Sequence, residues 1–118
     1  MATILILESR LKTSRLAYLV AHRGGHEVAV ISDLQTARQA LGALRFDLVI
    51  VESGLEEPCG ILRALRLDAE GLPVVFLAER PSRPPGDRAV VLAAPHTASA
   101  VAAAIAMSLA RAPRTAVS

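Results

Sequence analysis

The segment from Asp47 to Val51, with the sequence DLVIV, constrains the fold more than any other part of the chain. Its aliphatic residues follow one another without polar residues at alternate positions, so the strand that they predict is covered on both faces. Strands of this kind are typical of open parallel sheets, in which functional groups lie just past the carboxyl ends of the strands. Glu52 comes directly after this segment, so a functional acid is expected at that position.

Strand-like and helix-like segments alternate along the whole chain. Short aliphatic runs predict the strands, and the stretches between them carry apolar residues at the spacing of helices. This alternation predicts one parallel five-stranded sheet with strand order 2-1-3-4-5 and helices on both faces, which is the flavodoxin-like (βα)5 fold. The predicted strands are Thr3–Leu7, Glu27–Ile31, Asp47–Glu52, Pro73–Ala78 and Ala89–Ala93, and the predicted helices are Leu11–Arg23, Leu34–Leu44, Pro58–Leu67 and a last one that opens at 95–97 and runs to about Arg111.

Particular residues predict where the helices begin, end and face the core. Gly24 and Gly25 end the first helix, and Asp33 caps the second. Asp47 is predicted to be a polar residue at the entry of the third strand, at the sheet edge opposite to Glu52. The first helix is predicted from apolar residues at helical spacing, which are Leu11, Leu16, Leu19 and Val20.

The connection between the fourth and fifth strands, Glu79–Arg88, departs from the pattern. Its sequence ERPSRPPGDR has three prolines and a glycine in ten residues, a composition that does not support a regular helix. A parallel crossover usually needs about a dozen residues or more. We therefore predict that the fourth helix of this fold is missing or reduced to one turn.

Composition indicates one globular domain over residues 1–112, followed by a flexible tail or the start of a linker over 113–118. A hydrophobic content of 53% with 20% charged residues excludes a disordered chain. No uncharged apolar run approaches the ~20 residues of a membrane-spanning helix, and the N-terminal segment lacks the features of a signal peptide. The single cysteine, Cys59, excludes an internal disulfide. A cytoplasmic location is therefore expected.

The residue types present argue against several classes of ligand. The net charge of +2 is small, and the arginines are expected to form a solvated surface rather than a nucleic-acid site. No glycine-rich loop follows the first strand, which argues against a dinucleotide. The three histidines, His22, His26 and His96, do not have the spacing of metal ligands. We expect no cofactor, no metal, no nucleic acid and no membrane as a partner of this domain.

The motif FDLVIVE at 46–52, together with Gly60 in the following loop, resembles the third-strand motif of the receiver domains of two-component response regulators. The resemblance extends in pattern and spacing over nearly the whole chain, and it implies the (βα)5 fold and a role in bacterial signalling. In that family an Asp at the end of the third strand accepts a phosphoryl group with the help of Mg²⁺. The family's functional positions fall here on Glu8 and Ser9 after the first strand, Glu52, Ala78 after the fourth strand, and Ala94 before Pro95.

Most of these positions carry residues that do not suit phosphoryl transfer. Ser9 removes a charge from the metal site, and Glu52 places its carboxylate roughly 1.5 Å beyond that of an Asp, where about 1 Å of misplacement costs on the order of 100-fold in rate. The methyl groups of Ala78 and Ala94 neither hydrogen-bond nor neutralise a phosphoryl group. These departures predict a degenerate pseudo-receiver, which is not an enzyme and is not phosphorylated.

The role of Glu52 within such a pseudo-receiver has two interpretations. In the first, its extra length and negative charge mimic a phosphorylated Asp and hold the domain in an active state. In the second, the carboxylate is satisfied by a local partner, and we expect Arg10 or Arg80, which each lie just past a strand end, to form that ion pair. The lysine that would neutralise the site in the receiver family is absent, which favours a substitute cation.

The last helix predicts a surface for protein contacts. Val101, Ile105 and Leu109 form one inward stripe. No charged residue occurs from Thr97 to Ala110, whereas an ordinary surface helix has a charged face. The favoured partner is therefore a protein, either a second copy in a homodimer through this helix, another signalling protein or an adjoining domain. The alternative from a different class is a small-ligand sensor that uses the emptied acceptor pocket. The predicted contact residues are Ala98, Ala102, Ala106 and Ala110.

Overall fold

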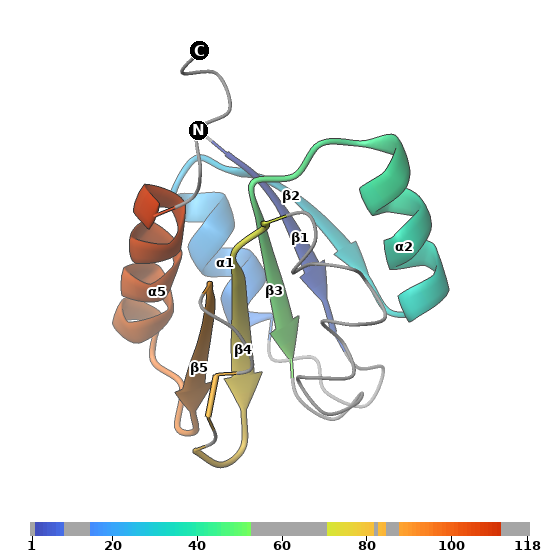
Figure 1. The fold of residues 1–118 in the computed structure, drawn as a ribbon. Coiled ribbons are helices and arrows are strands. Elements are labelled where there is room, and N and C mark those ends of the chain that lie inside the picture. The colour runs from blue at the N-terminus through green and yellow to red at the C-terminus, as the bar shows by residue number, and fades with distance from the viewer. Residues whose placement is uncertain (1, 9–14, 53–70, 82, 85–87, 112–118) are drawn as a thin grey trace.

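The computed structural model describes residues 2–8, 15–52, 71–81, 83–84 and 88–111 of the chain. Five strands and three helices occur in these ranges, and they alternate in the order that the sequence predicts (Figure 1). The third predicted helix, over 58–67, and the tail, over 113–118, lie outside the described residues. The strands are β1 (Thr3–Leu7), β2 (Glu27–Ile31), β3 (Leu48–Glu52), β4 (Val74–Ala78) and β5 (Ala89–Ala93), and the helices are α1 (Leu16–Arg23), α2 (Leu34–Ala43) and α5 (Ala98–Arg111).

The strands form one sheet in the order β2-β1-β3-β4-β5, and every neighbouring pair is parallel. This arrangement confirms the predicted flavodoxin-like topology. The central strand β3 is buried along all five of its residues, because the side chains of a strand alternate between two faces and both faces are covered. Three of the five strands have the predicted bounds, whereas β3 and β4 each begin one residue later than expected.

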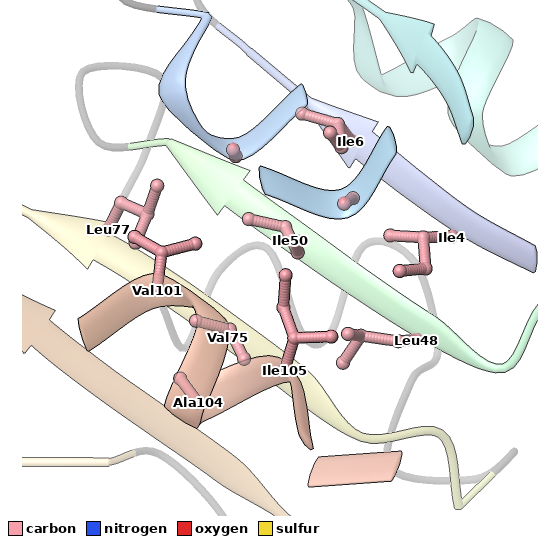
Figure 2. Close-up of a cluster of buried hydrophobic side chains, with 11 residues drawn as sticks. Ile4, Ile6, Leu48, Ile50, Val75, Leu77, Val101, Ala104 and Ile105 are labelled. Atoms are coloured by element: carbon pink, nitrogen blue, oxygen red, sulfur yellow. The ribbon is translucent and has the colours of Figure 1, made fainter. Parts of the chain in front are cut away.

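Two hydrophobic clusters lie on opposite faces of the sheet. On one face, alternate residues of β1, β3 and β4 pack against Ala17 and Ala21 of α1 and against Val101, Ala104 and Ile105 of α5. Figure 2 shows this cluster, in which α5 side chains point toward those of the strands. On the other face, the remaining strand residues pack around Phe46, Phe76 and Ala37 of α2. Helices therefore cover both faces, as the continuous apolar strands require.

Local hydrogen bonds explain several element ends. The Asp33 carboxylate accepts a hydrogen bond of 2.7 Å from the Thr36 backbone N–H, which confirms the predicted cap of α2. Thr97 caps α5 in the same way, since its hydroxyl accepts a bond of 3.1 Å from the Ala100 N–H. Gly25 follows α1 with a φ of 83°, a conformation that favours glycine.

Asp47 joins β3 to β1 where these strands begin. Its carboxylate accepts a hydrogen bond of 2.9 Å from the Thr3 backbone N–H, and its own N–H donates to the Thr3 carbonyl at 2.8 Å. This confirms the predicted role at the strand entry and places Asp47 at the sheet edge opposite to Glu52.

Two predictions about helices can be compared with the described residues. None of the described residues between β4 and β5, which are 79–81, 83, 84 and 88, is helical, in agreement with the expected loss of the fourth helix. The helical spacing of the first segment is confirmed over Leu16–Arg23, but Leu19, one of its apolar residues, is 51% exposed. The buried face of α1 is formed instead by Ala17 and Ala21, whose small side chains let the helix lie close to the sheet and to α5.

The inner face of α5 includes a buried polar residue that the sequence pattern did not reveal. Val101 and Ile105 are buried as predicted, but Ala104 and Ser108 are buried with them. The Ser108 side chain is 3% exposed, and its Oγ has no hydrogen-bond partner among the residues that the structure describes. A buried hydroxyl without a partner has lost its bonds to water and gained none in return.

We therefore expect Ser108→Ala to raise the free energy of unfolding by about 1–2 kcal/mol, from the desolvation cost that it removes and a smaller gain in helix propensity. The exposed Ser99 on the same helix provides the control, because Ser99→Ala gains the propensity term alone. Urea unfolding of the two variants measures the difference. Equal effects of the two substitutions would show that the Ser108 hydroxyl carries no penalty.

Candidate functional site

The carboxyl ends of the five strands meet at one edge of the sheet (Figure 1). All the neighbouring strands are parallel, and at this edge the last residues of neighbouring strands differ in register by at most one residue. The edge therefore brings together the residues that follow β1, β3, β4 and β5, as the topology requires. The pairs that define the register there are Leu7 with Ile31, Leu7 with Val51, Glu52 with Leu77, and Ala78 with Ala93.

Glu8 and Glu52 are neighbours at this edge. Leu7 lies opposite Val51, so the next residues along the two strands, Glu8 and Glu52, lie on adjacent strands about 4.8 Å apart at the backbone. Glu8 continues the ladder with β2, because its N–H donates to the Ile31 carbonyl at 3.0 Å. Alternation along the strands directs both side chains toward the face covered by α1 and α5. The register therefore places these two residues at the same edge of the sheet, on neighbouring strands.

The two carboxylates differ in their surroundings. Glu52 is 5% exposed, whereas Glu8 is half-buried. Glu52 is also engaged in a polar or electrostatic interaction within the protein, as expected for a buried acid, because an isolated charge would be too costly to desolvate. The site thus has one buried carboxylate, which interacts with another group of the protein, beside one that reaches solvent.

Ala78 and Ala94 lie next to each other on the far side of the site. The Ala94 backbone N–H donates to the Ala78 carbonyl at 2.9 Å, which extends the ladder between β4 and β5 by one residue. Ala78 is half-buried and Ala94 is exposed, and the peptide bond between Ala94 and Pro95 is cis. Methyl groups provide neither a hydrogen-bond donor nor a charge. The backbones of Ala78 and Ala94 therefore continue the pairing of β4 with β5, but their side chains have no group that binds an anion.

The predicted ion pair of Glu52 stays a prediction. Ser9 and Arg10 lie outside the described residues, and Arg80 is an exposed residue two positions past the end of β4. Another cation near this edge, Arg15, has its guanidinium carbon 5.8 Å from the ring centre of Tyr18. Arg15 also has a left-handed backbone, with a φ of 57°. No sequence pattern indicated this conformation, because glycine and asparagine are the usual signals for it.

Metal binding has no support within the described part of the chain, where no group of three or more His, Cys, Asp or Glu side chains is placed to hold an ion. The His96 ring lies 3.0 Å from the Leu92 carbonyl through Nε2, and His26 accepts a hydrogen bond from the Ala2 N–H through Nδ1 at 3.0 Å. These two histidines therefore have structural contacts with the backbone. Within the described ranges no helix has the length and apolarity that crossing a bilayer would require.

The predicted contact surface on α5 is exposed. Ala98, Ala102, Ala106 and Ala110 all lie on the outer side of the helix. Met107, at 55% exposure, adds a large apolar side chain to this surface. The uncharged face predicted from the sequence is therefore accessible to a partner on the described residues.

Comparison with solved structures identifies the fold. The chain superposes on the chemotaxis response regulator CheY4 of Vibrio cholerae with a TM-score of 0.76 and 18% identity, covering 92% of this chain and 99% of that one. A two-component response regulator from Clostridium difficile gives a TM-score of 0.76 at 16% identity, with coverage of 94% and 98%. A response regulator receiver protein from Sinorhizobium medicae gives 0.76 at 17%, with coverage of 93% and 95%.

The fold of this chain is therefore that of the receiver domains of response regulators, over nearly the full length of each of these chains. No protein-family model matches the sequence, and no curated protein matches it either. The similarity thus lies in the arrangement of the strands and helices, while the residues have diverged.

The buried position of Glu52 leads to a test. We expect Glu52→Gln to lower the free energy of unfolding by about 1–3 kcal/mol, because the substitution keeps the size of the side chain and removes the charge that its interaction uses. Glu8→Gln, at the half-buried neighbouring position, should change it by less than about 0.5 kcal/mol. Urea unfolding of both variants measures the difference. If Glu52→Gln is as neutral as Glu8→Gln, the charge of Glu52 has no structural partner.

Proposed function

We propose that this chain is a pseudo-receiver, a regulatory module of bacterial two-component signalling that acts in the cytoplasm through protein contacts and without phosphorylation. The receiver fold supports the assignment to two-component signalling. The observation that carries the rest is that Ala78 and Ala94, whose backbones are joined by a hydrogen bond at the carboxyl edge, both have methyl side chains.

The chemistry of phosphoryl transfer explains why this pair matters. A phosphoryl group brings nearly two negative charges and three acceptor oxygens, which need donors and cations in fixed positions. Ala78 and Ala94 supply neither, and Glu52 is buried and already engaged. A phosphoryl group on this edge would therefore be less stable than in a site with a hydroxyl and a lysine.

The same argument weakens the hypothesis that Glu52 mimics a phosphorylated Asp. A mimic works only if other groups bind it more strongly in the active state than in the inactive one. The two groups that would do so in the receiver family are alanines here. Satisfaction by a local partner is therefore the interpretation of Glu52 that we favour.

A protein is the partner that the exposed residues of α5 support. The helix has no charged residue from its start to Ala110, and its exposed positions are mostly alanines together with Met107. A solvated helix gains from charged residues, whereas a helix against another protein gains from small apolar ones. The partner would be a second copy, another signalling protein or an adjoining domain.

The decisive experiment is an amide-resolved NMR titration with Mg²⁺ and then with beryllofluoride, which mimics an acyl phosphate. We expect the amides of Glu8, Glu52, Ala78 and Ala94 to stay unmoved, because the edge lacks the groups that bind either species. A saturable shift of these amides would contradict the proposal and show that the domain is a phosphorylation switch.

A restored variant provides the control for this titration. The combination of Ser9→Asp, Glu52→Asp, Ala78→Thr and Ala94→Lys returns the receiver pattern to the same edge, and it should gain saturable shifts with both additions. If the amides shift in the variant but not in the wild type, the fold is able to bind both species, and the four substituted side chains explain why the wild type does not.

The small-ligand sensor is separated from the interaction module by a different measurement. A ligand that binds the folded state but not the unfolded one raises the melting temperature, and the rise grows with the ratio of its concentration to its Kd. Such a rise, lost when Ala94→Trp fills the edge, would favour the sensor over the interaction module.

A further inference from the structure

Among the described residues, β5 forms an outer edge of the sheet without a further pairing strand, and its five residues carry no charge. β5 pairs with β4 on one side, and no described strand pairs with its other side. Natural sheets usually protect such edges with lysines, prolines, bulges or a covering helix. The strand sequence AVVLA contains none of these residues, and no described residue of the preceding connection is helical.

The hydrogen bonds at both ends of β5 fix which backbone groups point outward. The Val74 N–H donates to the Arg88 carbonyl, and the Ala94 N–H donates to the Ala78 carbonyl. Arg88 and Ala94 therefore direct their backbone groups toward β4. Since this direction alternates along a strand, the N–H and C=O groups of Ala89, Val91 and Ala93 point away from the sheet.

We propose that β5 pairs with β5 of a second copy, antiparallel and about a two-fold axis at Val91, to make a continuous sheet of ten strands. The proposal deepens the interaction role given above and depends on it, because it names the partner and the surface. An extended strand that adds to an open sheet edge is an established mode of protein recognition.

The geometry of the edge fits a second copy better than an unrelated strand. A two-fold axis at Val91 pairs Val91 with its own equivalent and Ala89 with the partner's Ala93. Each of these pairs is of the kind that exchanges two hydrogen bonds, so every outward N–H and C=O of the strand finds a partner. The order of side-chain sizes, Ala-Val-Val-Leu-Ala, is nearly the same in both directions, as a self-complementary interface requires.

The charge pattern points the same way. No Asp, Glu, Lys or Arg occurs from Ala89 to Ala110, which includes all of β5 and all but the last residue of α5. A two-fold axis places residues near their own equivalents, so a charge close to the axis would face an identical charge at a cost in energy. This stretch presents no such charge.

The position of α5 makes the pairing compatible with the rest of the molecule. α5 packs on β4 and β5, on the face that also carries α1. A two-fold axis perpendicular to the sheet leaves both copies of α5 on the same face, on either side of the axis. The exposed residues of α5 include small side chains such as Ala102 and Ala106, which would take up little space between the two helices.

The opposite edge of the sheet lacks these properties. The β2 edge directs outward only the backbone groups of Val28 and Val30, because the neighbouring residues of β2 bond to β1. Glu27 is exposed at the start of this strand, and α1, which packs on β2, ends with the exposed Arg23 and is preceded by the exposed Arg15. Charges of this kind protect an edge against pairing.

The test is amide hydrogen exchange by NMR at low micromolar and at millimolar protein concentration, together with the mass in solution. We expect the mass to double with concentration. The amides of Ala89, Val91 and Ala93 should become protected in parallel, while those of Val90 and Leu92 stay protected throughout by their bonds to β4.

Two substitutions at one position separate the backbone from the side chain. Val91→Pro removes an N–H that faces outward, a place where an edge strand tolerates proline, and it should weaken self-association by at least about tenfold through the lost hydrogen bonds and the proline ring. Val91→Ala keeps the N–H and should preserve the dimer. If Val91→Pro does not fold, Ala102→Glu with Ala106→Glu, which adds like charges at exposed positions of α5, replaces it.

A chain that stays monomeric at millimolar concentration would overturn the proposal. So would a dimer in which Ala89, Val91 and Ala93 exchange as freely as in the monomer, since its contact would lie elsewhere. Neither result bears on phosphorylation, which the beryllofluoride titration tests by itself. If the chain is monomeric and its amides do not shift with beryllofluoride, the interaction module would still be supported, but its partner would be a different protein.

Discussion

The burial of β3 on both faces is the constraint on which the rest of this structure depends. A strand of four aliphatic residues ending in Glu52 satisfies its backbone only between two other strands and its side chains only beneath helices on both sides. Once β3 is central and parallel to β1 and β4, right-handed crossovers place α1 and α5 on one face and α2 on the other. The carboxyl edge then collects Glu8, Glu52 and Ala78 without any specific attraction between them.

The sequence was sufficient for the fold because strand-forming runs give a strong signal. The bounds of β1, β2 and β5 agree with the prediction to the residue, and the strand order follows from the alternation of strands and helices. The buried face of α1 is harder to predict from the sequence, because Leu19 is more hydrophobic than Ala17 and Ala21, although the two alanines are the buried residues. Ser108 was missed for a related reason, since in a helix made mostly of alanine little contrast remains to mark the inner face.

For the candidate site, the sequence predicted where the residues lie but not how they are satisfied. The strand ends fixed the places of Glu8, Glu52, Ala78 and Ala94, because position along a parallel strand determines position at the edge. Burial of Glu52 depends on side chains that arrive from distant segments, and neither spacing nor composition encodes them. The contact of Glu52 with Arg10 or Arg80 also depends on such distant segments, and it stays a prediction.

Two features of this chain, the alanines Ala78 and Ala94 at the carboxyl edge and the uncharged β5 edge, bear on the way a receiver-like domain can be regulated. A ligand shifts a conformational equilibrium only by its difference in affinity for the two states, and methyl groups at Ala78 and Ala94 leave a phosphoryl group little difference to exploit. Self-association offers another control, because the population of a dimer follows the concentration of the protein by mass action. Two observations favour control by self-association. No described residue between β4 and β5 is helical, and β5 carries no charge. If the proposed pairing of β5 holds, the amount of the protein rather than its phosphorylation would set the population of the dimer.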